Sequence, residues 1–412
     1  MRFGAVPLFL LLLIASLLLL RHGSRFSLRF NLPSVVTPGF LVCLIGAALA
    51  IAPAALRGTM GLVQVLRAAV LMPPTISGPY RADSATITLA ADADGQQTDR
   101  RPINLRLWYP ADLSPVPART NSIACRELDS VMRLPKAPTP YPFLLFAPWL
   151  GGKADMASLL TSSFARHGYV VAGIDDPAVD APAANASAAD EEARLRPFDF
   201  TSQEQYQATL QRGTLRAEQE AAWALEAADR LAACVQASPA LRDRIDFTRI
   251  GFVGYSFGAA AAAEASFLDS RIAAVVNLDG SQFGRAGENP VPVPYFVFFS
   301  DFDPKIVSNL NTPRRYEFMI DQRDYRRTDE QLKRPDSYAF IIRGSFHDTF
   351  ADPSPFSERT TLLTWLLLDP YRAHEIVQTY LLGFLDAYVK GDRRGLIGPH
   401  DPRYPEVRPF HW

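Results

Sequence analysis

The sequence predicts an α/β domain, in which a mostly parallel β-sheet of about eight strands carries helices on both faces. Three observations support this fold class. Short runs rich in β-branched and aromatic residues recur along the chain, helical segments separate them, and the later runs are continuously apolar rather than alternating. Alternating strands and helices build a parallel sheet, and strands buried on both faces are apolar throughout.

Eight segments are expected to form strands, because each is short and apolar and is bounded by turn residues. They comprise residues 84–90, 103–110, 142–148, 169–175, 249–254, 272–279, 294–301 and 338–344. Four longer segments have the spacing of apolar or small residues that is typical of helices. They comprise residues 156–168, 215–235, 258–268 and 357–368.

The composition of the chain excludes several classes of protein. With 412 residues and 48% hydrophobic residues, the chain can bury a large core. Lys and Arg number 42 against 43 Asp and Glu, and no long basic run occurs, so nucleic acid is not expected as a partner. The three cysteines lack the paired spacing of a zinc site, and at most Cys125 and Cys234 form one disulfide in an oxidising compartment.

The N-terminal region differs most from the rest of the chain. Residues 4–20 and 35–56 are two uncharged apolar runs, each of roughly membrane-spanning length. We expect two retained membrane helices, so that residues 1–57 form a membrane anchor. A cleaved signal peptide is the alternative for the first run, although only Arg2 precedes it and no clear small-residue cleavage site follows directly.

The charges between the two apolar runs predict the orientation of this anchor. Arg21, Arg25 and Arg29 lie in the intervening loop, and positively charged loops tend to stay in the cytoplasm. Both termini and the large domain would then lie outside the cytoplasm. Arg57 and Arg67 follow the second run and reduce this asymmetry.

Beyond the anchor, the chain divides into a short linker and one large domain. Residues 58–77 combine an amphipathic helix with a Pro-rich break, and residues 78–412 form the predicted α/β domain. Within this domain, residues 176–212 are rich in Ala, Asp and Pro and show no sustained apolar period. This insertion is either a surface excursion or a lid, since long irregular insertions in compact domains are often functional.

The segment GYSFG at residues 254–258 points to the chemistry of the domain. It places Ser256 between a predicted strand and an alanine-rich helix, which is the setting of a nucleophile elbow. Gly254 and Gly258 leave room where a sharp turn brings the strand and the helix together. A packing turn with a buried serine shows the same pattern, so a nucleophile at this position requires a base and an acid elsewhere in the chain.

His347 is the expected base. Of the six histidines, it alone lies directly after the last predicted strand, in the segment IIRGSFHDTFAD. In α/β-hydrolases the three residues of the triad follow the chain order serine, acid, histidine, and the histidine lies at this place. A loop histidine with only local hydrogen bonds is the alternative.

Two aspartates are candidates for the acid. Asp279 ends the sixth predicted strand, and Asp301 ends the seventh. Both ends lie on the edge of the sheet where strand C-termini and active sites meet in open α/β folds, so geometry permits either residue. The aspartate that does not serve as the acid is expected to cap a helix or a turn.

The tetrahedral intermediate of such a reaction needs two hydrogen-bond donors. The amide of Phe257, directly after the serine, is expected to be one of them. The segment FAPWLGGK after the third predicted strand would supply the other, with Leu150 as the donor and Gly151 and Gly152 allowing the backbone to turn inward.

Several segments in this order resemble the plasma-type platelet-activating factor acetylhydrolases and their bacterial relatives. They are LRLWYP, FLLFAPWLGG, RIGFVGYSFGAAA, VVNLDG and GSFHDTFAD, spread over about residues 105–350. The resemblance implies an α/β-hydrolase of the serine lipase type. It also implies calcium-independent hydrolysis of short or oxidised sn-2 acyl chains of phospholipids, with no metal or cofactor.

The resemblance also implies which residues form the site. In that family the acid follows the sixth strand in a Leu-Asp pair, which corresponds to Leu278 and Asp279. The implied triad is therefore Ser256, Asp279 and His347, with Leu150 and Phe257 as oxyanion donors.

Two departures from the family lie beside this site. The family usually has His-Gly before the oxyanion leucine, where this chain has Pro148 and Trp149, and Tyr255 replaces the residue, commonly His, before the serine. Both departures leave the implied triad intact. They predict a reshaped entrance to the acyl pocket.

The sequence therefore predicts a membrane-anchored serine hydrolase that acts on carboxylic esters. Phospholipids are the expected substrates, and the membrane is the expected partner of the N-terminal segment. Tethering would place the site beside a lipid substrate. A small-ester, polyester or dienelactone-type hydrolase on the same fold is the alternative enzyme, because a fold does not determine its substrate. A non-catalytic hydrolase-like module presented by the membrane segment is an alternative of another class.

Overall fold

The computed structural model describes residues 78–89, 102–112, 122–177, 198–352, 368–396, 398 and 401–412. All of them belong to one of the two units into which the chain divides, the unit formed by residues 73–354 and 358–412. The expected membrane spans, the linker at 58–77 and nearly all of the helix expected at 357–368 lie outside the described residues. In the described part of the chain, every helix is too short or too polar to cross a lipid bilayer.

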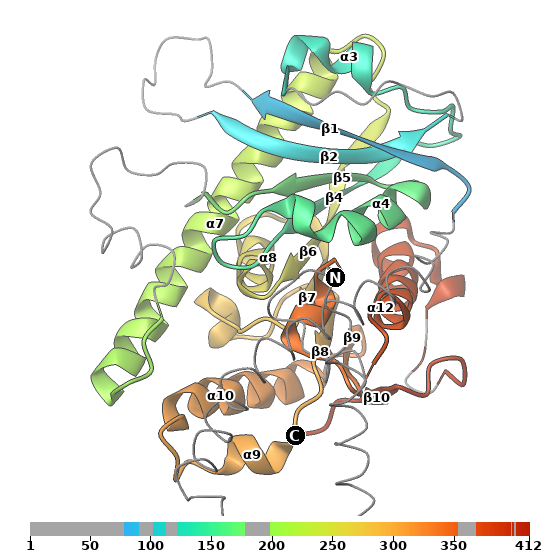
Figure 1. The fold of residues 1–412 in the computed structure, drawn as a ribbon. Coiled ribbons are helices and arrows are strands. Elements are labelled where there is room, and N and C mark those ends of the chain that lie inside the picture. Colours follow the sequence, from blue (N-terminus) through green and yellow to red (C-terminus); the bar gives the residue numbers. More distant parts are fainter. Residues whose placement is uncertain are drawn as a thin grey trace, which may run out of the picture. The chain divides into compact units, whose positions relative to one another are not determined.

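The core of the fold is a ten-stranded sheet with the order β10-β9-β8-β7-β6-β4-β5-β2-β1-β3 (Figure 1). Its strands are β1 Arg81–Leu89, β2 Ile103–Ala111, β3 Ile123–Ala124, β4 Tyr141–Ala147, β5 Val170–Ile174, β6 Ile245–Tyr255, β7 Ile272–Leu278, β8 Tyr295–Phe299, β9 Ser337–Ile342 and β10 Val407–Pro409. All eight expected strands are present. The sequence did not predict β3 and β10, because runs of two and three residues are too short to show a period.

The sheet is mostly parallel, as predicted. Strands β5, β4, β6, β7, β8 and β9 pair in parallel with their neighbours. The exceptions are β2, which runs antiparallel to both β1 and β5, and β10, which runs antiparallel to β9. In β1 the buried residues Ala85, Ile87 and Leu89 alternate with partly exposed ones, which is typical of an antiparallel strand with one solvated face.

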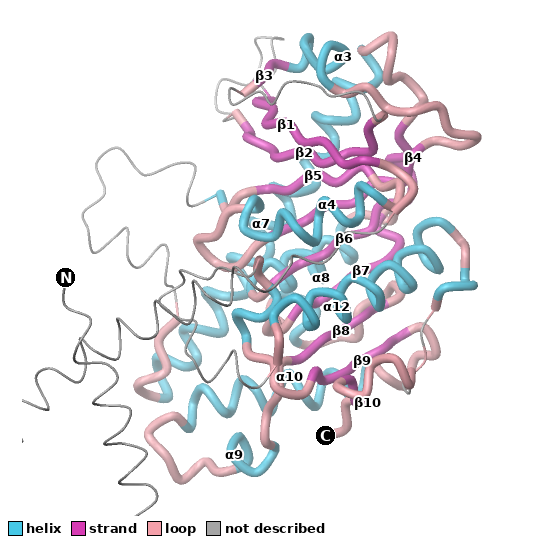
Figure 2. Tube along the Cα trace, turned by 45° about the vertical axis from the view of Figure 1, so that its right-hand side comes forward, coloured by secondary structure: helices cyan, strands magenta, loops and turns pink. Residues whose placement is uncertain are grey.

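Helices cover both faces of the sheet (Figures 1 and 2). The α-helices are α3 Leu128–Val131, α4 Ser158–Arg166, α7 Gln203–Ala237, α8 Phe257–Leu268, α9 Pro304–Ser308, α10 Arg315–Gln331 and α12 Pro370–Leu385. Short 3₁₀ or π segments are η1 Cys125–Glu127, η2 Ala154–Ala157, η3 Gly284–Gly287, η4 His347–Phe350, η5 Asp386–Lys390 and η6 Arg393–Gly395.

Each face of the sheet packs against its own apolar core, because successive side chains of a strand point to opposite faces. In β4, Phe143 and Leu145 belong to the core that α7, α8 and α10 cover. Leu144 and Phe146 of the same strand belong to the core that α4 and α12 cover. This arrangement confirms the prediction of helices on both faces.

Helix α7 corrects the predicted extent of the insertion. The sequence predicted an irregular segment from 176 to 212, but the helix begins at Gln203, where the Ser202 side chain accepts a hydrogen bond from the Gln205 amide. Figure 1 shows that this end of α7 projects beyond the sheet. The first turns of α7 carry only Tyr206 and Leu210 as large apolar residues, with Tyr206 stacked on Tyr316 of α10 at 5.8 Å, and two such residues are too few to show an apolar period in the sequence. Residues 178–197 of the predicted insertion lie outside the described residues.

A disulfide joins Cys125 of η1 to Cys234 near the end of α7, with an S–S distance of 2.02 Å. The two cysteines are 109 residues apart in the sequence. The bridge therefore ties the edge of the sheet at β3 to the helix that covers its face. Cross-links that close long loops stabilise a fold mainly by restricting the unfolded chain.

Candidate active site

Ser256 lies in a sharp turn between β6 and α8. Its φ is +55° and its ψ is −121°, a strained conformation for a residue with a side chain. A methyl group on Gly254 would lie 2.2 Å from the carbonyl oxygen of Gly258, and one on Gly258 would lie 2.3 Å from the last carbonyl of β4. The two glycines are therefore required by close backbone contact, as expected for a nucleophile elbow.

His347 reaches this serine from the loop after β9. Its Nε2 atom is 2.9 Å from Ser256 Oγ, and its Nδ1 atom is 2.7 Å from Asp279 Oδ2. Since a carboxylate only accepts hydrogen bonds, Nδ1 carries the proton and Nε2 faces the serine hydroxyl as an acceptor. The imidazole side chain is 46% exposed, so the site is open to a substrate.

Asp279 holds the other side of this imidazole. Its Oδ1 atom accepts hydrogen bonds from the backbone amide of Ser300 at 2.8 Å and from the Ser300 hydroxyl at 3.1 Å, while Oδ2 faces His347. Three donors thus orient one carboxylate. The backbone of Asp279 is itself strained, with a φ of +53°.

Asp301, the other candidate acid, has a different environment. Its Oδ2 atom accepts a hydrogen bond from the Gly344 amide at 2.8 Å, and its Oδ1 atom lies 3.3 Å from Arg408 Nη2. These contacts place the Asp301 carboxylate against the turn after β9. The structure therefore brings Asp279, and not Asp301, into hydrogen-bond contact with His347.

Tyr255 contributes to the site, although the sequence marked it only as a departure from the family. Its hydroxyl donates a hydrogen bond to the backbone carbonyl of His347 at 2.9 Å, and the two rings are 5.2 Å apart. Its ring also makes an edge contact with Trp149, the other departure, at 5.4 Å. The two departures from the family therefore pack against each other beside His347.

The candidate oxyanion donors lie on two adjacent segments. Phe257 is the first residue of α8, and the amides in the first turn of a helix have no acceptor within the helix. Leu150 belongs to Pro148–Gly152, which is named the oxyanion loop after its expected role and forms a turn in which the Gly152 amide donates to the Trp149 carbonyl at 2.8 Å. The side chains of Leu150 and Phe257 belong to the same apolar cluster.

Asp352 connects the histidine loop to the segment after the oxyanion loop. Its carboxylate accepts a hydrogen bond from the Leu159 amide at 3.0 Å, at the start of α4, and its own amide donates to the Met156 carbonyl at 2.9 Å. Burial raises the pKa of Asp352 to about 7. This last residue of the GSFHDTFAD segment thus has a structural role.

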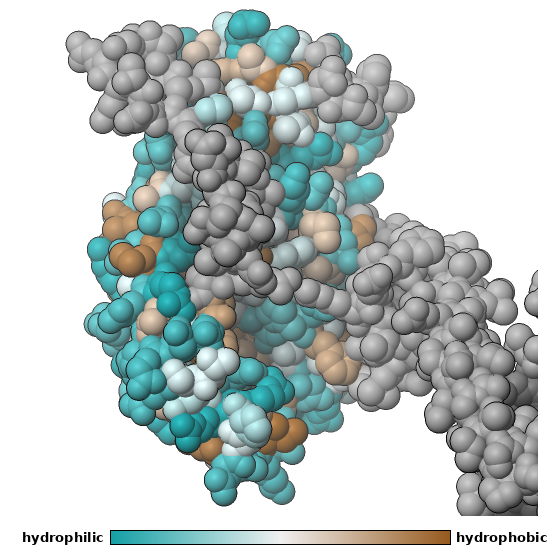
Figure 3. Space-filling view, turned by 60° about the vertical axis from the view of Figure 1, so that its left-hand side comes forward, coloured by the Kyte–Doolittle hydropathy of each residue, from teal (hydrophilic) through white to brown (hydrophobic). Residues whose placement is uncertain are grey.

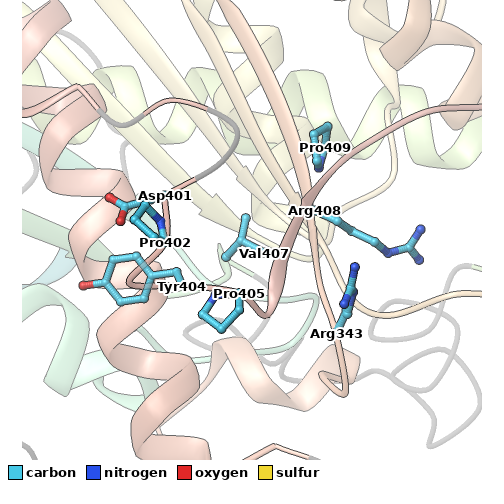
Figure 4. Close-up of a pocket in the computed structure, with 8 residues that line it drawn as sticks. All are labelled: Arg343, Asp401, Pro402, Tyr404, Pro405, Val407, Arg408 and Pro409. Carbon is cyan, nitrogen blue, oxygen red and sulfur yellow. The ribbon is translucent and has the colours of Figure 1, made fainter.

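Neither a metal site nor a second pocket adds to this site within the described residues. Among the described residues, no group of three or more His, Cys, Asp or Glu side chains is arranged to hold a metal ion. A separate shallow pocket of about 390 Å³ lies along β10 (Figure 4) and contains none of the three triad candidates. It is lined by Arg343, Asp401, Pro402, Tyr404, Pro405, Val407, Arg408 and Pro409.

Comparison with known proteins gives three findings. The family model described as "Platelet-activating factor acetylhydrolase, isoform II" matches residues 124–394. No curated protein matches the chain. Among solved structures, a ferulic acid esterase from Streptomyces cinnamoneus superposes with a TM-score of 0.56 at 20% identity, over 83% of this chain and 99% of that chain.

The structural likeness supports the α/β-hydrolase fold, and the family model covers well over half of the chain. The family predicted from the sequence is therefore confirmed. The chain belongs to the platelet-activating factor acetylhydrolase isoform II family, and it is a serine hydrolase of the α/β-hydrolase fold that acts on carboxylic esters.

Proposed function

We propose that Ser256, His347 and Asp279 are the catalytic triad of this enzyme and that its substrates are phospholipids with a short or oxidised sn-2 acyl chain. The observation that carries the proposal is the unbroken hydrogen-bond chain from Ser256 Oγ to His347, at 2.9 Å, and from His347 to Asp279, at 2.7 Å. A serine hydroxyl needs such a base, and the base needs such a carboxylate.

The proposed reaction passes through an acyl-enzyme. His347 Nε2 takes the proton of Ser256 Oγ while Oγ bonds to the acyl carbon, and the amides of Phe257 and Leu150 donate hydrogen bonds to the resulting oxyanion. The bond to the alcohol oxygen then breaks, and this oxygen takes the proton from His347. Water attacks the acyl carbon with the same base, and Ser256 leaves with its proton restored.

The surroundings of the oxyanion donors support an apolar acyl group. Leu150 and Phe257 border a cluster in which the rings of Phe198, Phe257 and Phe283 lie 5.3 to 5.6 Å from one another. On the face shown in Figure 3 the described surface is mainly hydrophilic, with small separate apolar patches. Met156 and Phe346 are exposed apolar side chains close in sequence to the oxyanion loop and to His347.

A hydrolase of small or aromatic esters is the second candidate. Phe198, the partly exposed ring of the same cluster, offers a surface on which a planar aromatic acyl group can stack. The structural neighbour is named a ferulic acid esterase. Polyester and dienelactone-type substrates belong to this candidate as well.

We also propose that residues 1–57 anchor the enzyme in a membrane with the catalytic domain outside the cytoplasm. The uncharged runs at 4–20 and 35–56 support the anchor. The disulfide between Cys125 and Cys234 supports an oxidising compartment for the domain.

Replacing Ser256 by alanine is expected to remove labelling by a fluorophosphonate and to lower kcat for ester hydrolysis by about 10⁴-fold or more, because no nucleophile remains. Ser266→Ala is the matched control, since Ser266 is a buried serine of the same helix whose hydroxyl donates to the Ala263 carbonyl. Labelling that persists in Ser256→Ala would contradict the proposed nucleophile.

Replacing Asp279 by asparagine is expected to lower kcat by about 10³- to 10⁴-fold. The asparagine amide can place a donor opposite His347 Nδ1 and so favour the tautomer that cannot accept the serine proton. Asp301→Asn is the control and should keep kcat near the wild-type value while lowering the melting temperature. Steady-state kinetics with a soluble ester measure both variants, and the reverse ranking of the two kcat values would show that Asp301 is the acid.

Phospholipid vesicles are expected to be hydrolysed faster when the sn-2 chain is acetyl than when it is palmitoyl, because the site would accept only a short or oxidised chain. The measurement is kcat/KM for the two phospholipids, beside p-nitrophenyl acetate and methyl ferulate. Turnover of the soluble esters without turnover of either phospholipid would favour the second candidate.

The full chain is expected to remain in the membrane fraction after carbonate extraction, because two apolar helices would hold it there. A chain that begins at residue 78 is expected to be released. Release of the full chain would show that residues 1–57 are not a stable anchor.

A further inference from the structure

Three charged side chains lie together behind the oxyanion loop, and the proposed reaction uses none of them. Asp176 follows β5, while Arg216 and Glu220 lie one turn apart on α7. The Arg216 guanidinium pairs with the Asp176 carboxylate through Nη2 and with Glu220 Oε1 through Nε, the latter at 2.6 Å. Their side chains are 2%, 13% and 8% exposed for Asp176, Arg216 and Glu220.

This cluster contacts the oxyanion loop through Asp176. The Oδ2 atom of Asp176 accepts a hydrogen bond from the Gly151 amide at 2.5 Å, while Oδ1 faces Arg216. The backbone amide of Asp176 donates to the Gly152 carbonyl at 3.1 Å. One residue therefore holds two successive residues of the loop, and α7 holds that residue.

These contacts favour one of the arrangements that a four-residue turn can adopt. The turn from Trp149 to Gly152 has the peptide between Leu150 and Gly151 at its centre, and a flip of that peptide interconverts the two commonest turn types. Gly151 has a φ of +70°, the value of the type II turn. The hydrogen bond from the Gly151 amide to Asp176 stabilises this orientation of the peptide between Leu150 and Gly151. That peptide directly follows the Leu150 amide, so its orientation restricts the backbone of Leu150.

Burial of these charges is costly, so their arrangement calls for a reason. A buried ion pair contributes little net stability compared with apolar residues of the same size, although removing one partner is destabilising. Burial and the nearby Asp176 raise the pKa of Glu220 to about 8. The geometry supplies that reason, because the cluster leaves Asp176 Oδ2 directed at the Gly151 amide of the loop while Arg216 pairs with Oδ1 and with Glu220.

We propose that Asp176, held by Arg216, is a positioning residue that keeps the oxyanion loop in the conformation in which the Leu150 amide faces the acyl carbonyl oxygen. This inference rests on the proposed roles of Ser256 and Leu150. Asp176 touches no reacting atom and acts through the backbone of the loop. Its contribution is therefore to kcat, through the transition state, rather than to substrate binding.

The test is Asp176→Asn. In the aspartate one oxygen faces the Gly151 amide and the other faces Arg216, whereas asparagine would turn an NH2 donor group toward one of these two donors. Because loss of one oxyanion donor costs about 10²–10³-fold in kcat, we expect the variant to lose about 10- to 100-fold in kcat with KM nearly unchanged. The inhibition constant of a trifluoromethyl ketone, which forms an oxyanion in the site, should rise by a similar factor.

Glu264→Gln is the matched control. Glu264 is also a fully buried carboxylate that accepts a backbone amide, that of Arg285 at 2.7 Å, and it faces the Arg285 guanidinium at 3.5 Å. It lies about two turns beyond the nucleophile on α8 and does not contact the loop. Both variants are expected to lower the melting temperature, but only Asp176→Asn should change kcat and the inhibition constant, each measured per folded enzyme.

Arg216→Lys provides a second variant if Asp176→Asn does not fold. A lysine keeps the positive charge but cannot reproduce the two-sided contact of the guanidinium with Asp176 and Glu220. We therefore expect kcat to fall with KM nearly unchanged, by a smaller factor than in Asp176→Asn. If the variant that folds keeps the wild-type kcat and the wild-type inhibition constant, while Ser256→Ala is inactive, the role of Asp176 is overturned and the proposed function is not. Full activity of Ser256→Ala would instead overturn the proposed function.

Discussion

Six neighbouring strands of this sheet run parallel, from β9 across to β5, and their carboxyl ends therefore lie at one edge. Almost every group of the site follows one of these ends. The nucleophile candidate Ser256 follows β6, Asp279 follows β7, and His347 comes from the loop after β9. Ser300 follows β8 and orients Asp279, and the oxyanion loop follows β4. The shared direction of the strands thus brings together residues that are far apart in the sequence.

The edge of the sheet also holds two strained residues in place. Ser256 and Asp279 both have positive φ values without being glycine, which costs free energy of order 1–3 kcal/mol each. The Ser256 amide donates to the Leu278 carbonyl at 2.9 Å, and the Asp279 amide donates to the Phe298 carbonyl at 2.8 Å. These bonds continue the pairing of β6 with β7 and of β7 with β8, so the sheet itself offsets the strain where the two side chains must point toward His347.

Much of this arrangement could be predicted from the sequence, because the informative patterns are local. The elbow around Ser256 combines a strand, two glycines and a helix within a few residues, and the place of His347 follows from chain order. The acid could not be decided in this way, since Asp279 and Asp301 both end a strand. The family resemblance pointed to Asp279, and the fold separates the two residues directly: Asp279 faces His347, whereas Asp301 faces the turn at Gly344.

Other features depend on contacts that no local pattern reveals. Tyr255 reaches the backbone of His347, 92 residues later in the chain. Asp176 lies in a segment that reads as an irregular insertion, and its partner Arg216 lies 40 residues away on a helix whose first turns show no apolar period. Such pairs become visible only when the fold brings β5 and α7 together.

The buried carboxylates near the site link its structure to pH. The pKa of Glu220 is raised to about 8, mainly by burial, and burial likewise raises that of Asp352 to about 7. A raised pKa means that the folded state binds the proton more tightly than the unfolded chain does, so this part of the stability is present below the unfolded pKa values near 4 and is lost as pH rises through 7 to 8. The two carboxyls belong to the support of the oxyanion loop and to the start of α4. Deprotonation of these two carboxyls therefore weakens the support of the loop and the start of α4, whereas the close glycine contacts of the elbow contain no titrating group.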